Sequence, residues 1–327
     1  MTRTTASTTS RTPVRRRTLL AVMCTALLLE GMSLSSTNIQ LPAIQRDLGL
    51  SDSSLSLVVA AFLASFAGLL MLGGQCADAF GRRRVFIAGV GLFGAASILA
   101  GAADGAVQLV TARALQGLGA ALSLPAAVSI ITNTFEEGRP RDQALAVYSA
   151  TGAAGFGLGL LAAGASTELL DWRWGFWVYV PCALAAVIGA VTSVPAHRPE
   201  SRTSPPWGSS LLIAWTLVAV IAAAAMAQNR LWGLSLATAA TALVPAAWFL
   251  TLQRRGASPP LPRDVVSARP VLIGVGSLAL GFGTVTSSLF LAGTGLQEDL
   301  ATALSSPGSR FSRRGPWSCC CPRSGRR

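Results

Sequence analysis

The sequence predicts an all-α protein whose helices cross a membrane several times. Charged residues make up only 12% of the chain and hydrophobic residues 51%, whereas soluble domains carry about 25% charged residues. Apolar runs of the length that a membrane-spanning helix needs recur along the chain. These runs are continuous and rich in Ala and Gly rather than alternating, which excludes a transmembrane β-barrel.

Nine apolar segments are long enough to span a bilayer. The small residues that they share allow helices to approach closely in lipid, where no hydrophobic force drives one helix against another. The expected spans are residues 18–42, 53–75, 85–104, 107–132, 143–166, 175–194, 209–228, 233–252 and 270–293.

The placement of arginine predicts that the N-terminus lies in the cytoplasm. All 26 basic residues are Arg, and most of them precede the first span or follow the second, fourth, sixth and eighth spans. Between the spans on the opposite side stand only Arg46, Arg173 and Arg230. Because cytoplasmic loops carry the excess of Arg and Lys, we expect a multi-pass protein of the cell membrane. A cleaved signal after Arg15–Arg17 is disfavoured, since Glu30 interrupts the apolar run and no cleavage site stands out.

Composition excludes several other function classes. The formal charge of +12 would suit a nucleic-acid-binding protein, but the Arg residues form short clusters between apolar runs, so no nucleic-acid partner is expected. The six Cys lack the spacing of zinc ligands, and no metal site is expected. The single His, His197, has no nucleophile–base pair around it. The sequence therefore does not predict an enzyme. It also contains no nucleotide-binding motif, so an ATP-driven transporter is not predicted.

The first span contains an acidic residue, Glu30, near the middle of the expected membrane segment. The segment is similar to the first helix of the 14-helix drug:proton antiporters, whose motif L-D-x-T-x-x-N-x-A-L-P-x-I is matched at Asn38 and at Leu41–Ile44. The Asp position of the motif holds Ser33, and Glu30 lies one turn earlier on the same face. An intramembrane carboxyl group is a functional-site hypothesis, so Glu30 is predicted to exchange a proton. A protonated Glu that serves only packing is the alternative.

The loop between the second and third spans carries the most specific pattern, from Gly74 to Arg84. Its first Gly allows close helix contact, its Asp stands at a helix end among cations, and its second Gly allows a sharp turn. The segment resembles the cytoplasmic loop motif of the major facilitator superfamily, G-x-x-x-D-x-x-G-R-[KR]-[KR]. In that family the Asp and the first Arg form a charge network that latches one conformation; a cluster that only sets topology is the alternative. The resemblance implies a conformational latch made by Gly74, Asp78, Gly81, Arg82 and Arg83.

The fourth span contains Arg113, two turns from its start. Residues 109–121 resemble the R-x-x-Q-G-x-G-A-A helix motif of the same superfamily, with Gln116 and Gly117 at matching positions. A charged residue inside a span usually faces a cavity or a partner, and a cation beside a carboxyl group favours its ionised form. Arg113 is therefore predicted to take part in proton coupling together with Glu30. An Arg that snorkels to the interface is the alternative.

The fifth span is rich in Gly and resembles the antiporter motif of the exporter branches, G-x-x-x-G-P-x-x-G-G. Gly155, Gly159 and Gly164 match, but the Pro position holds Leu160 and the first of the paired Gly is Ala163. The resemblance implies that the three Gly residues shape a moving fifth helix. Because Pro normally kinks this helix, its absence leaves plain Gly-x-x-x-Gly packing as an equally good interpretation.

The resemblance covers about residues 18–297 and implies the organisation of the 14-helix branch, in which a helix pair is inserted between two six-helix halves. Asp171–Trp174 resembles the W-R-W junction before the sixth span and is interpreted as structural. The expected parts are a disordered cytoplasmic N-terminus (1–17), a six-helix half (18–194), a cytoplasmic linker (195–208), the inserted pair (209–252), the first helix of an incomplete second half (270–293) and a basic tail (301–327).

The basic tail contains several Arg, no acidic residue and three adjacent Cys. After nine spans from a cytoplasmic start it would lie outside the cell, against the positive-inside rule. We hypothesise that the tail is off-frame translation; a genuine basic tail for anionic surfaces is the alternative.

The function implied by the resemblance is export of small organic molecules, drugs or metabolites, coupled to a proton gradient and without a bound cofactor. The expected partners are the lipid bilayer and a small amphipathic organic substrate, while the substrate-binding residues and the oligomeric state are not predicted. Facilitator transport needs two six-helix halves that rock around a central site. A non-transporting truncated membrane protein, or a partner of a full-length transporter, is therefore the alternative.

Overall fold

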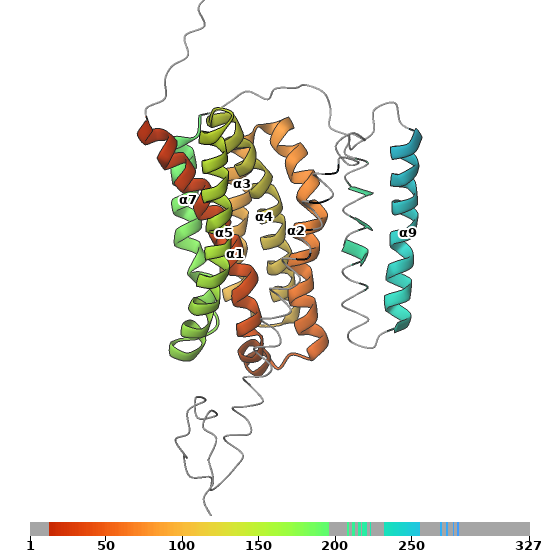
Figure 1. The fold of residues 1–327 in the computed structure, drawn as a ribbon. Helices are drawn as coiled ribbons and strands as arrows, with labels where there is room; N and C mark the ends of the chain where they lie inside the picture. Colours follow the sequence, from red (N-terminus) through yellow and green to blue (C-terminus); the bar gives the residue numbers. More distant parts are fainter. Residues whose placement is uncertain are drawn as a thin grey trace, which may run out of the picture. The chain divides into compact units, whose positions relative to one another are not determined.

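The computed structural model describes residues 13–195 and 232–255, together with scattered residues between 208 and 223 and at 269, 273, 277 and 280. All the regular structure in these parts of the chain is α-helical. The helices, as labelled in Figure 1, are α1 (Pro13–Leu48), α2 (Asp52–Phe80), α3 (Arg82–Gly101), α4 (Ala106–Thr134), α5 (Arg139–Leu169), α6 (Trp174–Trp177), α7 (Tyr179–Ser193) and α9 (Trp232–Arg255).

Six helical segments in the described residues are long and apolar enough to cross a membrane. Five of them lie in α1 to α5, and the sixth is Trp174–Ser193, which joins the short α6 to α7. They coincide with the six spans expected between residues 18 and 194. This confirms the predicted fold class, an all-α protein with several membrane-spanning helices.

The ends of the chain's helices differ from the expected spans. α1 begins at Pro13, a residue that suits the first turn because it lacks an N–H, so residues 13–17 are helical rather than part of a disordered N-terminus. The expected eighth span, residues 233–252, lies within α9 (Trp232–Arg255). The other expected spans beyond residue 208, the linker and the basic tail fall almost entirely outside the described residues.

The six membrane helices form one bundle in which α2 packs on α4, α3 on α4, and α1 along α5 (Figure 1). Gly89 of α3 and Gly119 of α4 show how close the contacts are. A Cβ atom built on either Gly would lie 2.7 Å from the carbonyl oxygen of the other. The Gly-rich composition therefore allows main chain to pack on main chain, as expected for helices in lipid.

The turn between α2 and α3 depends on Gly81. Its backbone has a φ of 95°, and its N–H donates a hydrogen bond of 3.1 Å to the carbonyl of Ala77. Residues with a side chain rarely adopt a positive φ. This turn brings the end of α2 and the start of α3 together, so that Asp78 and Arg82 become neighbours.

Candidate functional site

The buried side of α1 changes its chemistry halfway along the helix. Buried positions follow one another at intervals of three or four residues, or as adjacent pairs, and therefore share one face. The apolar half of α1 buries Leu19, Val22, Met23, Ala26 and Leu29. The polar half of α1 buries Glu30, Ser33, Ser36, Thr37 and Gln40.

Arg113 of α4 lies against the polar half of α1. Its Nη1 donates to Ser33 Oγ at 2.8 Å and to Gln116 Oε1 at 2.9 Å, and its guanidinium lies 4.4 Å from the ring centroid of Phe62. Gln116 in turn donates to Ser97 Oγ of α3 at 2.8 Å. The side chain is only 1% exposed, so Arg113 does not snorkel to an interface. It belongs to a hydrogen-bonded chain that crosses α1, α4 and α3.

Glu30 is buried beside a single side-chain partner, Ser123 of α4. The hydroxyl of Ser123 donates to Glu30 Oε1 at 2.6 Å, and it also lies 2.9 Å from the carbonyl oxygen of Gly119. A hydroxyl has one proton to donate. Ser123 can thus donate to an ionised Glu30, or donate to Gly119 while a protonated Glu30 donates to Ser123. The site accepts both protonation states of the carboxyl group without moving the backbone.

Glu30 and Arg113 do not form an ion pair. The second carboxylate oxygen of Glu30 and the Nε of Arg113 both lack a hydrogen-bond partner. The two side chains are instead linked through α1, because Ser33, which holds Arg113, stands one turn after Glu30. The free oxygen of Glu30 is therefore available to a proton or to a polar donor, and the Nε–H of Arg113 is available to an acceptor.

Gln116 and Gly117, the other predicted residues of α4, have different surroundings. Gln116 connects Arg113 to α3 as described above. A Cβ on Gly117 would collide with the main-chain carbonyl of Phe62 in α2. Gly117 therefore permits the contact between α2 and α4, and Gln116 belongs to the polar cluster.

The predicted latch residues gather at the end of the bundle where α2 meets α3. Asp78 Oδ1 and Arg82 Nε are 3.9 Å apart, and the Asp78 side chain is 66% exposed. Arg83 Nη2 donates to the carbonyl oxygen of Val191 in α7 at 2.6 Å. A Cβ atom built on Gly74 would lie 3.8 Å from the Cβ of Pro125. The motif thus joins the ends of α2, α3 and α7, and its role as a latch stays a prediction.

The three predicted Gly residues of α5 do not act alike. A Cβ on Gly155 would lie 2.6 Å from the carbonyl oxygen of Leu28, and one on Gly159 would lie 2.5 Å from that of Met32. Around Gly164 nothing lies within 4 Å. Gly155 and Gly159 therefore allow α5 to contact the main chain of α1 at the junction of its two halves, whereas Gly164 has open space.

Several polar residues of the site were not singled out from the sequence. They include Ser123, Ser97 and Gln40, and also the buried pair Ser36 and Tyr179, whose hydroxyl oxygens are 2.5 Å apart. Ser36 and Gln40 follow Ser33 at helical spacing, a signal that the sequence did contain. Ser97 on α3, Ser123 on α4 and Tyr179 on α7 do not stand out from the sequence around them.

A second polar cluster lies where the C-terminal end of α1 meets the loop before α6. Arg173 Nη1 and Trp172 Nε1 both donate to Asp47 Oδ2, at 2.7 and 3.1 Å. Arg173 Nη2 also donates to the carbonyl of Ala103, between α3 and α4, at 3.3 Å. These bonds join the end of α1 to two loops, the one before α6 and the one between α3 and α4.

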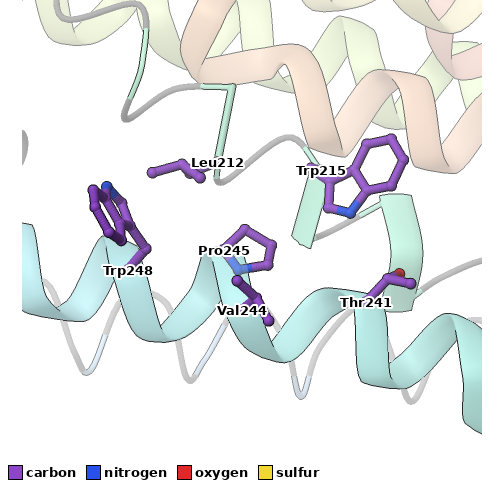
Figure 2. A pocket seen from close by; sticks show the side chains of 6 residues that line it. All are labelled: Leu212, Trp215, Thr241, Val244, Pro245 and Trp248. Carbon is purple, nitrogen blue, oxygen red and sulfur yellow. The ribbon is translucent and has the colours of Figure 1, made fainter.

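A separate apolar hollow of about 420 Å³ lies along α9. Figure 2 shows its walls, with Trp215 and Trp248 standing at opposite ends of the hollow. None of its lining residues belongs to the polar cluster, and Thr241 is the only polar side chain among them. The hollow is lined by Leu212, Trp215, Thr241, Val244, Pro245 and Trp248.

Comparison with known proteins decides the family of the chain. The family profile described as Major Facilitator Superfamily matches residues 23–309. The chain belongs to the major facilitator superfamily. The members of this superfamily are membrane transporters and not enzymes.

Relatives within the superfamily include proteins named for antibiotic resistance and export. The puromycin resistance protein pur8 of Streptomyces alboniger is 38% identical over 309 residues, which cover 84% of this chain and 61% of that protein. The cephamycin export protein CmcT of Amycolatopsis lactamdurans is 34% identical over 268 residues, 80% of this chain and 55% of that protein. The chain therefore spans little more than half the length of these superfamily members.

Solved structures of the superfamily fold agree with the bundle. A crystal structure of the peptide transporter POT in complex with sulfate has a TM-score of 0.56 and 18% sequence identity, and the match covers 73% of this chain and 53% of that one. At this identity the match establishes the fold alone. The fold and the family together identify a multi-pass membrane protein.

Proposed function

We propose that this superfamily member serves proton-coupled export of small amphipathic organic molecules across the cell membrane, with its N-terminus in the cytoplasm. The observation that carries the proposal is Glu30, a carboxyl group buried inside the bundle with one hydroxyl partner that suits both of its protonation states. The names of the relatives, which refer to puromycin resistance and cephamycin export, support the substrate class.

In the proposed cycle, Glu30 takes up a proton from one side of the membrane and releases it to the other. Arg113 supplies a fixed positive charge that is held by Gln116 and by Ser33, the residue one turn after Glu30 on α1. When Glu30 loses its proton, the positive field of Arg113 stabilises the carboxylate. The proton gradient is the energy source, and no other cofactor takes part.

The proposed latch operates at the end of the bundle where α2 meets α3. The ion pair of Asp78 and Arg82 is long, at 3.9 Å, and partly exposed, so it is weak and easily broken. Gly74 and Gly81 allow the close contact and the sharp turn that bring the charges together. Arg83, bound to the end of α7, transmits a change at this end to the last helix of the bundle.

The proposal is tested by following ethidium, an amphipathic cation, in cells that express the whole chain. We expect energised cells to extrude ethidium, and the Glu30→Gln variant to lose extrusion that depends on the proton gradient. Ser35→Ala is the matched control, because Ser35 is also buried on α1 but its hydroxyl bonds only to carbonyls of its own helix. Normal extrusion by Glu30→Gln at equal membrane abundance would contradict the proposal. Absence of extrusion by the unmodified chain would favour a non-transporting protein.

A further inference from the structure

We propose that, in one of the two states of the transport cycle, protons reach Glu30 through the polar half of α1, along a path formed by Ser33, the Ser36–Tyr179 hydroxyl pair and a water site at Gln40. In that state the apolar half of α1 seals the other side. This inference rests on the proposed function, in which Glu30 binds a proton, and it adds the side and the route of access.

The residues of the path follow one another along the buried face of α1. Glu30, Ser33, Ser36 and Gln40 lie on one face of α1 and are at most 5% exposed. Ten residues of α-helix correspond to about 15 Å, so the line covers roughly half of the hydrocarbon core. On the other side of Glu30, the same face of α1 presents only the apolar side chains of its apolar half.

The middle of the path is the contact between Ser36 of α1 and Tyr179 of α7. Their hydroxyl oxygens are 2.5 Å apart, and either one can be the donor. A hydroxyl both donates and accepts. The pair can therefore accept a proton on one side and release one on the other by reorienting, with no net change in either group.

The far part of the path is Gln40, whose side chain is 0% exposed. Both its amide oxygen and its amide nitrogen lack a hydrogen-bond partner. Buried amides are almost always bonded to protein or to ordered water. The amide packs directly against Gly175 of α6, where a Cβ would collide with it. The two unpartnered ends of Gln40 thus indicate a water site, one helical turn from Ser36.

On the buried face of α1, Ile44 lies between Gln40 and Asp47. Ile44 is fully buried, and one turn beyond it Asp47 is bound by Trp172 and Arg173 and reaches solvent. The path is therefore closed by one apolar turn in this conformation. The proposed path opens when Ile44 moves aside and water reaches Gln40.

Ionisable groups on several helices surround Glu30. Arg113 of α4 and Tyr179 of α7 lie on the side of the polar half, while Cys24 of α1 and Tyr148 of α5 lie toward the apolar half. The sequence has only two Tyr, and they stand on opposite sides of Glu30. They provide a matched pair of variants, Tyr179→Phe and Tyr148→Phe.

The test measures the transient current that follows a pH step on proteoliposomes adsorbed to a solid-supported membrane, with the full chain and without substrate. We expect a current from proton binding that Glu30→Gln abolishes. Tyr179→Phe and Ser36→Ala should slow this current about tenfold, the effect of raising a barrier by about 1.4 kcal/mol. Tyr148→Phe and Ser35→Ala should leave its rate unchanged.

The outcomes separate the route of access from the proposed function. If Glu30→Gln keeps the current, the proton-binding role of Glu30 is wrong. If Glu30→Gln abolishes the current but Tyr179→Phe and Ser36→Ala are as fast as the unmodified chain, the route is wrong and the proton-binding role stands. A slow Tyr148→Phe with a normal Tyr179→Phe would place the access on the apolar side. Thermal unfolding of each variant shows which ones fold. If Tyr179→Phe does not fold, Ser36→Ala tests the route in its place.

Discussion

The apolar and polar halves of α1 occupy the same helix, face the same bundle and are equally buried, yet they bury opposite chemistry. In the apolar half, Leu and Met side chains fill space, and any apolar side chain of similar volume would do so. In the polar half, several polar side chains bond to groups on other helices: Glu30 to Ser123, Ser33 to Arg113 and Ser36 to Tyr179. Burial alone therefore does not distinguish a surface that only packs from a candidate functional surface. Hydrogen bonds to side chains on other helices do.

The largest expected effect comes from placing a carboxyl group in the apolar half. Ala26→Asp puts an acidic side chain beside the buried apolar Val22, Met23 and Leu29 and one turn before Glu30, which offers it no positive charge. An unpartnered polar group in such surroundings is strongly destabilising. We expect loss of the folded bundle, measured as loss of monodisperse protein and of a cooperative thermal transition in detergent.

Thr37→Val is the control in the polar half. The Thr37 hydroxyl donates only to the carbonyl of Ser33 in its own helix, so Val, which has a similar shape, should leave the transition almost unchanged. If Ala26→Asp were as stable as Thr37→Val, the contrast between the halves would not hold.

A smaller effect is expected at the junction of the two halves, where α5 contacts α1. Gly155→Ala places a Cβ 2.6 Å from the carbonyl oxygen of Leu28, and the main chains must separate. We expect a loss of about 1–3 kcal/mol, the usual cost of overpacking, measured by chemical or thermal unfolding. Gly164→Ala has open space and should be neutral or more stable by up to about 1 kcal/mol. Equal stability of the two variants would contradict the junction contact.

The smallest effect is expected at Asp47, near the end of α1 and beyond its polar half. Asp47→Asn removes the charge but keeps an oxygen that can accept from Trp172 and Arg173. Since the ion pair is partly exposed, we expect only a small fall in the thermal midpoint. This fall should shrink as salt is added, because salt screens exposed charges. A large fall in the thermal midpoint that does not depend on salt would mean that the cluster at Asp47 is as shielded from solvent as the polar half.

Much of the fold could be predicted from the sequence because apolar runs report membrane helices directly. The middles of the six described spans were predicted, but the ends were not. Polar residues such as Gln45, Arg46 and Asp47 lower hydropathy, yet they continue α1 beyond the apolar run because a helix satisfies its own backbone wherever it lies.

The candidate site was predicted only where a residue contrasts with its own surroundings in the sequence. Glu30 and Arg113 are charged residues inside apolar runs, so they could be found. Ser123 and Tyr179 are ordinary residues of their helices, and only the packing of α1 on α4 and α7 gives them a role.

The Gly residues of α5 show what periodicity alone could have revealed. Gly155 and Gly159 are four residues apart and share a face. Gly164 follows Gly159 by five residues and is rotated by about 140° from it. Helical geometry therefore separates Gly164 from the face that contacts α1, although the resemblance to the antiporter motif grouped the three together.

The reciprocal contact of Gly89 and Gly119 has a consequence for how this sequence can change. Each Gly is blocked by the carbonyl oxygen of the other, and every amino acid carries that oxygen. No exchange at one position can make room for a side chain at the other, so the two positions cannot compensate each other. A second-site suppressor of Gly89→Ala should arise in residues that let α3 and α4 move apart, and not at Gly119. We therefore expect both positions to remain Gly.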